Sequence, residues 1–304
     1  MRISVINTGN FKLDGGAMFG VVPKKLWSRT NPADQNNLCN WAMRSLLIEN
    51  GEKLILIDTG IGNKQDDKFF SHYHLNGDDN LEKSIKNAGY TIDEVTDVIL
   101  THLHFDHCGG AVQWKNNERN ILEPYFKNAI YWSNKEHWKC ANQPNSRERA
   151  SFLKENISPI QESGQLKFIE RNGQFSKSVF PNMDVFFADG HTESQMIPII
   201  KYKGKSIAFM ADLLPSVGHI PLPYVMGYDT RPLKTLSEKY FFLNFAFEND
   251  YLLFLEHDPI NESCKLKKSD KGIQLDTTHN IIMNIITSLK IRKSLIFKYF
   301  NLFL

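Results

Sequence analysis

Cysteine is scarce in this sequence, and its few occurrences are not arranged in pairs. The four thiols of the 304-residue chain are Cys39, Cys108, Cys140 and Cys264. Short paired spacings are typical of zinc knuckles, and dense sets of cysteines are typical of small disulfide-bonded domains. The spacing therefore argues against both, and we expect Cys108, which adjoins a histidine-rich stretch, to be a small buried residue rather than a ligand.

A strong net charge and a long apolar run near the start of the chain are also lacking. With 36 Lys and Arg against 34 Asp and Glu, the formal charge is +2, which gives no broad electrostatic footprint for nucleic acid. Residues 1–7 alternate as in a strand, so we expect no secretory signal and a cytoplasmic protein. The hydrophobic share of 41% is sufficient for a large core, and we expect a small-molecule substrate.

What the chain does contain is a dense cluster of metal-competent residues within positions 98–110. Three apolar residues that predict a buried strand are followed by His102, His104, Asp106 and His107, and then by two glycines. Imidazole and carboxylate are usual ligands of divalent ions. Histidines two apart on an extended backbone point the same way, and we expect the glycines to give the following turn conformational freedom. The stretch therefore predicts a metal site.

Other histidines lack this setting. His72 and His74 are also two apart, but no apolar strand precedes them and no pair of glycines follows, so we expect them to lie outside the metal site. His137 lies in a less regular segment, residues 114–173, and we expect it at the surface or in ordinary packing. A long segment after a metal motif could form the roof of a substrate pocket.

Short apolar strands that end in a metal-competent residue recur along the chain. The residues that directly follow such strands are Asp58 after 53–57, Asp189 and His191 after 184–188, Asp212 after 206–211, and Glu256, His257 and Asp258 after 251–255. Because packed strands bury their bodies and expose their ends, these side chains are expected to converge on one edge of a sheet. Three of them, His191, Asp212 and His257, supply the ligands that the first cluster lacks.

Local patterns place further elements between these strands. They predict a strand at 2–7, a hairpin of strands 42–48 and 53–57 joined at Asn50-Gly51, a helix at 81–88 closed by Gly89, and a capping box at Thr91–Glu94. We therefore expect one large domain of strands and helices that spans residues 1–276.

With these residues, the chain resembles the metallo-β-lactamase fold superfamily, whose signature H-x-H-x-D-H is followed by distant His, Asp and His ligands. The resemblance runs from about residue 1 to about residue 264. It implies an α/β (α+β) fold, a four-layer αββα sandwich of two mixed β-sheets with a two-metal centre on one edge. One departure is that Gly190–Gln195 lacks the Pro-Gly that commonly follows Gly-His-Thr in this superfamily, which puts the shape of the following loop in question.

The resemblance also implies a division of the ligands between two ions. It assigns the first ion to His102, His104 and His191, the second to Asp106, His107 and His257, the bridging position to Asp212, and a supporting role without metal binding to Asp58. We expect two divalent ions, zinc first, while a site made of His and Asp also suits Mn, Fe or Co.

Stretches outside the metal motif narrow the resemblance. Three stretches resemble the quorum-quenching lactonase branch of the superfamily, which also contains organophosphate hydrolases. They are Gly15–Gly20 with Pro23 and Trp27, Phe209–Pro215 and Glu256–Pro259. Asp212 argues against the true β-lactamase subclasses with Cys at the bridging position, and His104 argues against the flavodiiron relatives that commonly carry Glu.

The expected chemistry follows from two ions held about 3.5–4 Å apart, which lower the pKa of a bridging water to near neutrality. The resulting hydroxide attacks a carbonyl, and the metals stabilise the charged intermediate. We assign the catalytic roles to Asp212 as the bridge and to Asp106, which could pass a proton to the leaving alkoxide.

The expected substrate is an ester-type ring, a lactone such as an N-acyl homoserine lactone. Candidate substrate-binding residues are Phe19 and Trp27, as an acyl-chain wall, and Tyr224 and Tyr228. A phosphotriester or phosphodiester hydrolase on the same two-metal site and a noncatalytic metal-dependent binding protein remain as alternatives. Assembly as a homodimer is a further alternative that the sequence leaves undecided.

The final residues, 277–304, have a composition of their own. They contain no Asp or Glu, and their apolar residues recur at roughly helical spacing. Four basic residues, Lys290, Arg292, Lys293 and Lys298, interrupt the pattern and make a membrane span a poor interpretation. We expect a basic amphipathic tail that could contact a membrane or a partner, or pack on the domain.

Overall fold

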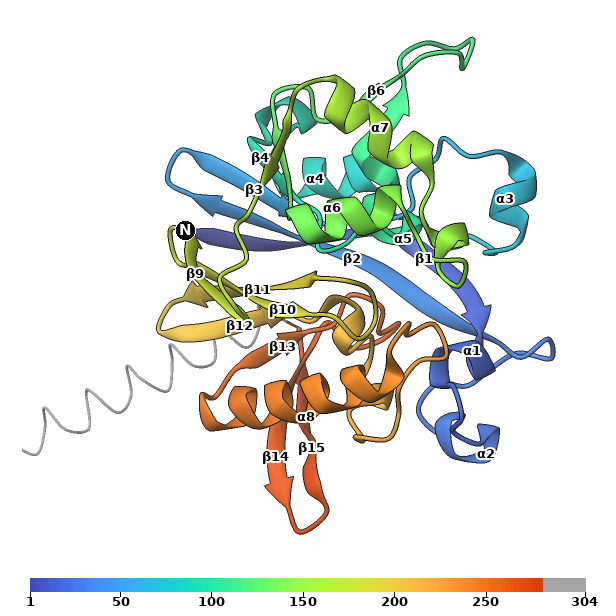
Figure 1. Ribbon diagram of the computed structural model, residues 1–304, viewed down its shortest axis with the longest axis vertical. Helices are drawn as coiled ribbons and strands as arrows, with labels where there is room; N and C mark the ends of the chain where they lie inside the picture. The colour runs from blue at the N-terminus through green and yellow to red at the C-terminus, as the bar shows by residue number, and fades with distance from the viewer. Residues whose placement is uncertain (281–304) are drawn as a thin grey trace, which may run out of the picture.

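Two mixed β-sheets face each other in the middle of the molecule, with helices on both outer sides (Figure 1). The structure, a computed structural model, describes residues 1–280. The first sheet has the order β1 (Arg2–Asp14), β2 (Leu38–Asn50), β3 (Lys53–Ile57), β4 (Asp97–Ile99), β7 (Ile130–Ser133) and β8 (Leu166–Phe168). The second has the order β15 (Gly272–His279), β14 (Ser263–Ser269), β13 (Leu252–Phe254), β12 (Lys205–Phe209), β11 (Gln195–Tyr202), β10 (Met183–Ala188) and β9 (Phe175–Phe180). The predicted αββα sandwich is confirmed.

Helices cover the outer face of each sheet. The described α-helices are α1 (Gly15–Phe19), α2 (Lys24–Trp27), α3 (Asp67–Ser71), α4 (Leu81–Asn87), α5 (Phe105–Cys108), α6 (Lys135–Asn142), α7 (Lys154–Glu162) and α8 (Pro232–Glu248), and a small separate sheet pairs β5 (Val112–Trp114) with β6 (Leu122–Pro124). In Figure 1, α4, α6 and α7 lie over the first sheet and α8 lies across the second. A proline in the first turn starts α8, which buries residues at the spacing of one helical face.

Strand β3 shows why the sheets stack as they do. Ile55 and Ile57 belong to the core between the two sheets, whereas Leu54 and Leu56 belong to the core under the helices of the first sheet. Side chains alternate along a strand, so a continuous apolar run supplies both cores at once. Such runs therefore indicate strands that are covered on both faces.

Several predicted local elements are confirmed. Strands β2 and β3 pair as a hairpin in which Asn50 faces Lys53, and the backbone of Gly51 has a φ of +67°. The predicted helix is α4, which begins where the Asn80 side chain accepts a hydrogen bond from the backbone N–H of Lys83 at 2.9 Å. Strand β1 is longer than predicted, because an irregularity in its pairing near Asn7 lets it continue past the predicted end.

The end of the sandwich lies slightly beyond the expected domain boundary at residue 276. Strand β15 pairs with β14 as far as His279, so residues 277–279 belong to the second sheet. Residues 281–304, where the amphipathic tail is predicted, lie outside the described residues. Within residues 1–280, no helix is both long and apolar enough to cross a membrane.

The two glycines after the metal motif serve close packing and not the conformational freedom that we expected of them. Gly109 has an ordinary helical φ of −59°, and Gly110 is not among the residues with a positive φ. A Cβ on Gly109 would lie 2.1 Å from the carbonyl oxygen of Ile61, and one on Gly110 would lie 2.3 Å from that of Thr59. The backbone that follows β3 is therefore packed directly against the backbone that follows α5.

A Gly109→Ala variant should accordingly be destabilised by about 1–3 kcal/mol, the usual penalty for overpacking. The added methyl group must push the α5 turn, which carries Asp106 and His107, away from the backbone of Ile61. Urea denaturation of the variant and the parent would measure the difference. An unchanged midpoint and slope would show that the two loops are not in the tight contact described.

Candidate metal centre

The predicted ligands sit at strand ends with a common spacing. His102, His191, Asp212 and His257 are each the third residue after the last residue of their strand, namely β4, β10, β12 and β13. All four strands end at the same edge of the sandwich, where the four predicted ligands are at most 7% exposed as whole residues. The convergence expected of strand ends is present.

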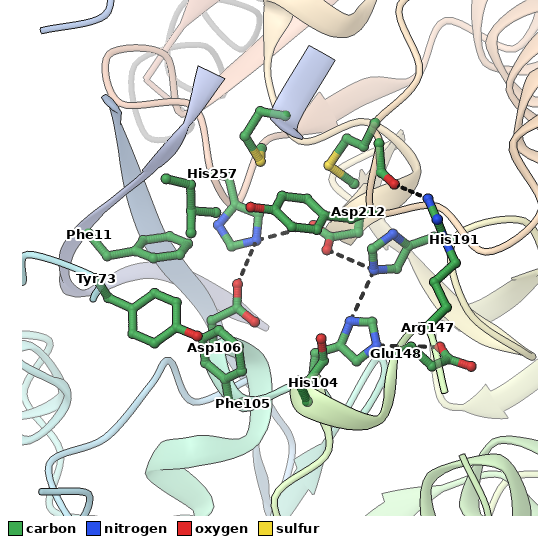
Figure 2. Close-up of a pocket in the computed structure, with 17 residues that line it drawn as sticks. Phe11, Tyr73, His104, Phe105, Asp106, Arg147, Glu148, His191, Asp212 and His257 are labelled. Atoms are coloured by element: carbon green, nitrogen blue, oxygen red, sulfur yellow. Dashed lines mark hydrogen bonds and ion pairs between the residues drawn. The ribbon is translucent and has the colours of Figure 1, made fainter. Parts of the chain in front are cut away.

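The first group of ligand atoms comes from His102, His104, His191 and Asp212, whose atoms lie within 4.8 Å of one another. Nε2 of His191 lies 3.1 Å from Nδ1 of His104 and 3.0 Å from Oδ2 of Asp212. Nε2 of His102 lies 3.7 Å from the same oxygen. Four potential donors therefore surround one point, and three of them, His104, His191 and Asp212, also line a cavity (Figure 2).

The second group comprises Asp106, His107 and His257. Nε2 of His257 lies 3.2 Å from Nε2 of His107, and each of these nitrogens lies 3.8 Å from Oδ2 of Asp106. Asp106 and His107 come from the short helix α5, and His257 reaches them from the opposite sheet. The two sheets thus hold this group between them.

Asp212 stands between the groups and turns one oxygen toward each. Its Oδ2 faces His191 at 3.0 Å, and its Oδ1 faces His257 at 3.1 Å. The bridging role expected of Asp212 stays a prediction, and it requires an oxygen on each side as found here. The seven predicted ligands are therefore brought together as two groups that meet at one carboxylate.

The donors fit divalent ions. Two nitrogens on one tetrahedral ion with bonds of 2.0–2.1 Å are about 3.3 Å apart, close to the 3.1 and 3.2 Å between the facing imidazole nitrogens. Among residues 1–280, Nε2 of His102 is buried and has no hydrogen-bond partner. Such an atom is costly unless a ligand takes it up, so we regard the two groups as built for metal.

The charge around the groups favours cations as well. Asp58, Asp106, Asp212 and Glu256 are at most 9% exposed, and Arg147 is the only Lys or Arg among the described residues that line the cavity. Several buried carboxyl groups with one nearby guanidinium concentrate negative charge at the cluster when they ionise. Two divalent ions would neutralise it.

The carboxylates also change the protonation of the histidines. Burial alone would lower the pKa of His191 and of His257, but the Asp212 carboxylate outweighs it and raises them to about 10 and about 9. For His102, burial together with the neighbouring imidazoles holds the pKa well below its usual value. In the absence of metal, the carboxylate of Asp212 therefore stabilises the protonated imidazoles of His191 and His257.

The outward ring nitrogens of the histidines are held by protein acceptors. Nδ1 of His191 lies 2.8 Å from Oδ1 of Asp229, and Nδ1 of His257 lies 2.8 Å from the carbonyl oxygen of Ala42. Nδ1 of His107 lies 3.1 Å from Oδ2 of Asp58. These contacts fix the rings so that the other nitrogen points into the cluster. Asp58 therefore contacts a predicted ligand at the ring nitrogen that faces away from the cluster, and its supporting role stays a prediction.

Asp229 and Glu148 are functional candidates that the sequence pattern missed. Glu148 is buried, accepts a hydrogen bond from Thr192 at 2.8 Å and lies 3.6 Å from Nε2 of His104. Neither residue follows an apolar strand, so neither carries the signal that revealed the ligands. Both residues lie in loops that are distant in sequence from the histidines they approach.

The loop after His191, which lacks Pro-Gly, is held by polar contacts of Ser194. Ser194 has a φ of +56°, and its N–H donates to Asp189 at 3.0 Å. Its carbonyl oxygen accepts from Asn134 at 2.8 Å. Polar contacts to α6 therefore take the place of the missing Pro-Gly turn.

His137 is a packing residue but not a surface one. It is fully buried in α6, where Nε2 accepts a hydrogen bond from the N–H of Leu103 at 2.8 Å. Burial lowers its pKa to about 3, so the ring stays neutral and can accept. It holds the backbone between the first two ligands. His72 and His74 are exposed and lie outside both groups.

A cavity of about 380 Å³ opens above the two groups. Its walls are mostly apolar: Phe11, Tyr73 and Phe105 lie close to the ligands (Figure 2), and Met18 also lines the cavity. Part of its roof comes from residues 147–151 in the long segment after the metal motif, where a roof was expected.

The four predicted substrate residues are placed differently from one another. Tyr228 lines the cavity, whereas Phe19, Trp27 and Tyr224 are not among its lining residues. Phe19 and Trp27 are fully buried and stack with ring centroids 5.2 Å apart. They lie behind the wall, in the cluster that supports Met18.

His219 completes this supporting cluster and was not predicted. Its ring stacks on Phe19 at 4.4 Å, accepts from Ser216 and donates to the carbonyl oxygen of Met18 at 2.9 Å. Burial lowers its pKa to about 3. A neutral imidazole thus anchors the residue that forms part of the cavity wall.

His219 should make stability depend on pH. Because the folded pKa is depressed, its contribution is complete above the unfolded value of about 6.5 and is lost as the pH falls toward 3. Between pH 7.5 and pH 5, the parent should lose about 2 kcal/mol more of its free energy of unfolding than a His219→Gln variant. Urea denaturation at the two pH values would measure this, and equal losses would contradict it.

Comparison with known proteins adds an independent finding. A family model described as the metallo-beta-lactamase superfamily matches residues 44–267. An N-acyl homoserine lactonase of Bacillus cereus is 24% identical over 184 residues, which are 57% of this chain and 64% of that enzyme. The alignment thus spans less than two thirds of the length of that relative.

Solved structures extend the likeness over nearly the whole chain. A probable metal-dependent hydrolase from Staphylococcus aureus superposes with a TM-score of 0.81 at 28% identity, covering 91% of this chain and 95% of that one. A dizinc quorum-quenching lactonase, solved with its product, gives a TM-score of 0.72 at 21% identity, covering 92% and 97%. At that identity the second likeness shows the fold alone.

Proposed function

Because the chain belongs to the metallo-β-lactamase superfamily, we propose that its cavity is the active site of a two-metal hydrolase that opens a lactone, such as an N-acyl homoserine lactone. The observation that carries the proposal is Asp212, with one carboxylate oxygen facing each of two ligand groups at 3.0 and 3.1 Å. The named activity of the Bacillus cereus relative supports the choice of a lactone.

His102, His104 and His191 would hold one ion, and Asp106, His107 and His257 the other, with Asp212 shared. Two divalent ions, zinc first, would supply Lewis acidity and a low-pKa water for attack on the ester carbonyl. Mn, Fe and Co suit the same donors.

The residues of the chain itself would bind the substrate and move the proton. Asp106 lines the cavity, so its carboxylate can carry a proton to the oxygen of the leaving alkoxide. Tyr228 also lines it; although the residue is 41% exposed, partial desolvation raises the pKa of its phenol, and a phenol is protonated and can donate at neutral pH in any case. Phe105 and Tyr73 limit the access of bulk water.

The apolar wall would bind the acyl chain. Phe11, Leu13 and Met18 line the cavity directly. In this proposal Phe19 and Trp27 act from behind Met18, and their stacking keeps the wall rigid. This is a narrower role than the direct contact expected of them from the sequence.

A substrate panel would test the proposal. Protein with measured metal content should hydrolyse N-acyl homoserine lactones, detected as acid release, faster than aryl phosphotriesters or phosphodiesters. Faster turnover of a phosphorus ester would replace the lactone assignment. Stoichiometric metal without turnover of any ester would instead indicate a binding protein.

A further inference from the structure

Glu256 is a fully buried carboxylate that the proposed chemistry does not use. It lies between strand β13 and His257, and its backbone carbonyl oxygen accepts from the N–H of Arg44 at 3.1 Å. Its side chain is 0% exposed and turns toward His107, with Oε2 3.1 Å from Nδ1. It therefore approaches the imidazole from the side opposite to the ligand cluster.

The same ring nitrogen already has a carboxylate partner in Asp58. Asp58 accepts the ring contact at 3.1 Å and two further hydrogen bonds, from the N–H and the hydroxyl of Thr101 at 2.7 and 2.6 Å. Within the described residues, neither oxygen of Glu256 accepts a hydrogen bond. One ring proton cannot satisfy both carboxylates, so Glu256 is the one left without a donor.

A buried carboxylate without a donor is unfavourable for folding. It becomes favourable when a divalent cation binds on the other side of the ring, because its charge makes the imidazole a stronger ligand and attracts the ion directly. Asp58 differs in that Thr101 stabilises it whether or not metal is present.

We propose that Glu256 is a positioning residue that increases the affinity of the Asp106–His107–His257 group for its ion, at the expense of the stability of the metal-free fold. This rests on the two-metal centre of the proposed function. It distinguishes two carboxylates that face the same nitrogen: Asp58 supports both the fold and the metal, and Glu256 supports the metal alone.

The test is a Glu256→Gln variant compared with the matched Asp58→Asn variant. Competition of each full-length protein with a chelating dye for Zn²⁺ would give the two dissociation constants, and urea denaturation in chelator would give metal-free stability. Glu256→Gln should weaken the second ion by about tenfold to a hundredfold, with the first ion unchanged. Its metal-free form should be at least as stable as the parent.

Asp58→Asn should weaken the metal and also destabilise the metal-free protein. Glu256→Leu, which removes the charge without adding an amide, should reproduce the pattern of Glu256→Gln. Unchanged affinity for the second ion, or a metal-free variant less stable than the parent, would overturn the inference about Glu256. A parent protein that binds fewer than two ions would overturn the two-metal proposal, and this inference with it.

Discussion

An Asp212→Asn variant should bind metal at less than two ions per chain and hydrolyse lactones roughly a hundredfold to a thousandfold more slowly, the range for losing one group that stabilises transition-state charge. The substitution keeps the shape of the side chain but removes the charge shared between His191 and His257. Metal analysis of the purified variant and initial rates at saturating lactone would measure both effects.

Asp250→Asn is a suitable control, because the Asp250 side chain is 72% exposed and pairs with Lys265, away from the ligand groups. This variant should retain the metal content and the rate of the parent. If Asp212→Asn kept both as well, the carboxylate would not join the two groups, and the mechanism would have to rest on one ion.

The metal centre could be predicted because each ligand follows a recognisable strand. Apolar runs such as Ile55–Ile57 reveal a strand through hydrophobicity, and the polar residue that follows marks the exposed end. Parallel neighbours such as β3 and β4 end at the same edge, so the residues after them meet. The sequence therefore contained enough to group seven residues at one place.

Residues that reach the centre from loops could not be predicted in this way. Asp229 contacts His191 from 38 positions away, and Glu148 approaches His104 from 44 positions away, with no local pattern around either. Their placement depends on how long connections cross the edge of the sandwich, which composition and periodicity do not encode.

The aromatic residues near the N-terminus show a second limit. A glycine-rich apolar segment predicts packing at a wall, but it does not say which side chain faces inward. In the structure Met18 lines the cavity and Phe19 packs behind it against Trp27 and His219. Neighbouring residues on a short helix point in different directions, so an error of one position exchanges a lining residue for a supporting one.

Removal of metal should lower the stability of the protein as well as abolish its activity. An ion that binds only the folded state contributes about 4 kcal/mol when its concentration is a thousandfold above its dissociation constant. The buried carboxylates of Asp106 and Asp212 then lose their cations, and facing imidazoles are left with only protons to compensate. Urea denaturation with and without chelator, together with lactone rates after adding back Zn, Mn, Fe or Co, would measure both losses.

The pH dependence of the metal-free protein would show whether the imidazoles of the cluster account for the stability lost with the metal. Asp212 raises the pKa of His191 to about 10 and of His257 to about 9, so their stabilising protons are fully present below the unfolded value of about 6.5. That stability is lost as the pH rises through 9 and 10. Metal-free protein should therefore weaken toward high pH, whereas metal-loaded protein should not, because ions have replaced the protons. Parallel pH profiles for the two forms would mean that the imidazoles do not face the ions.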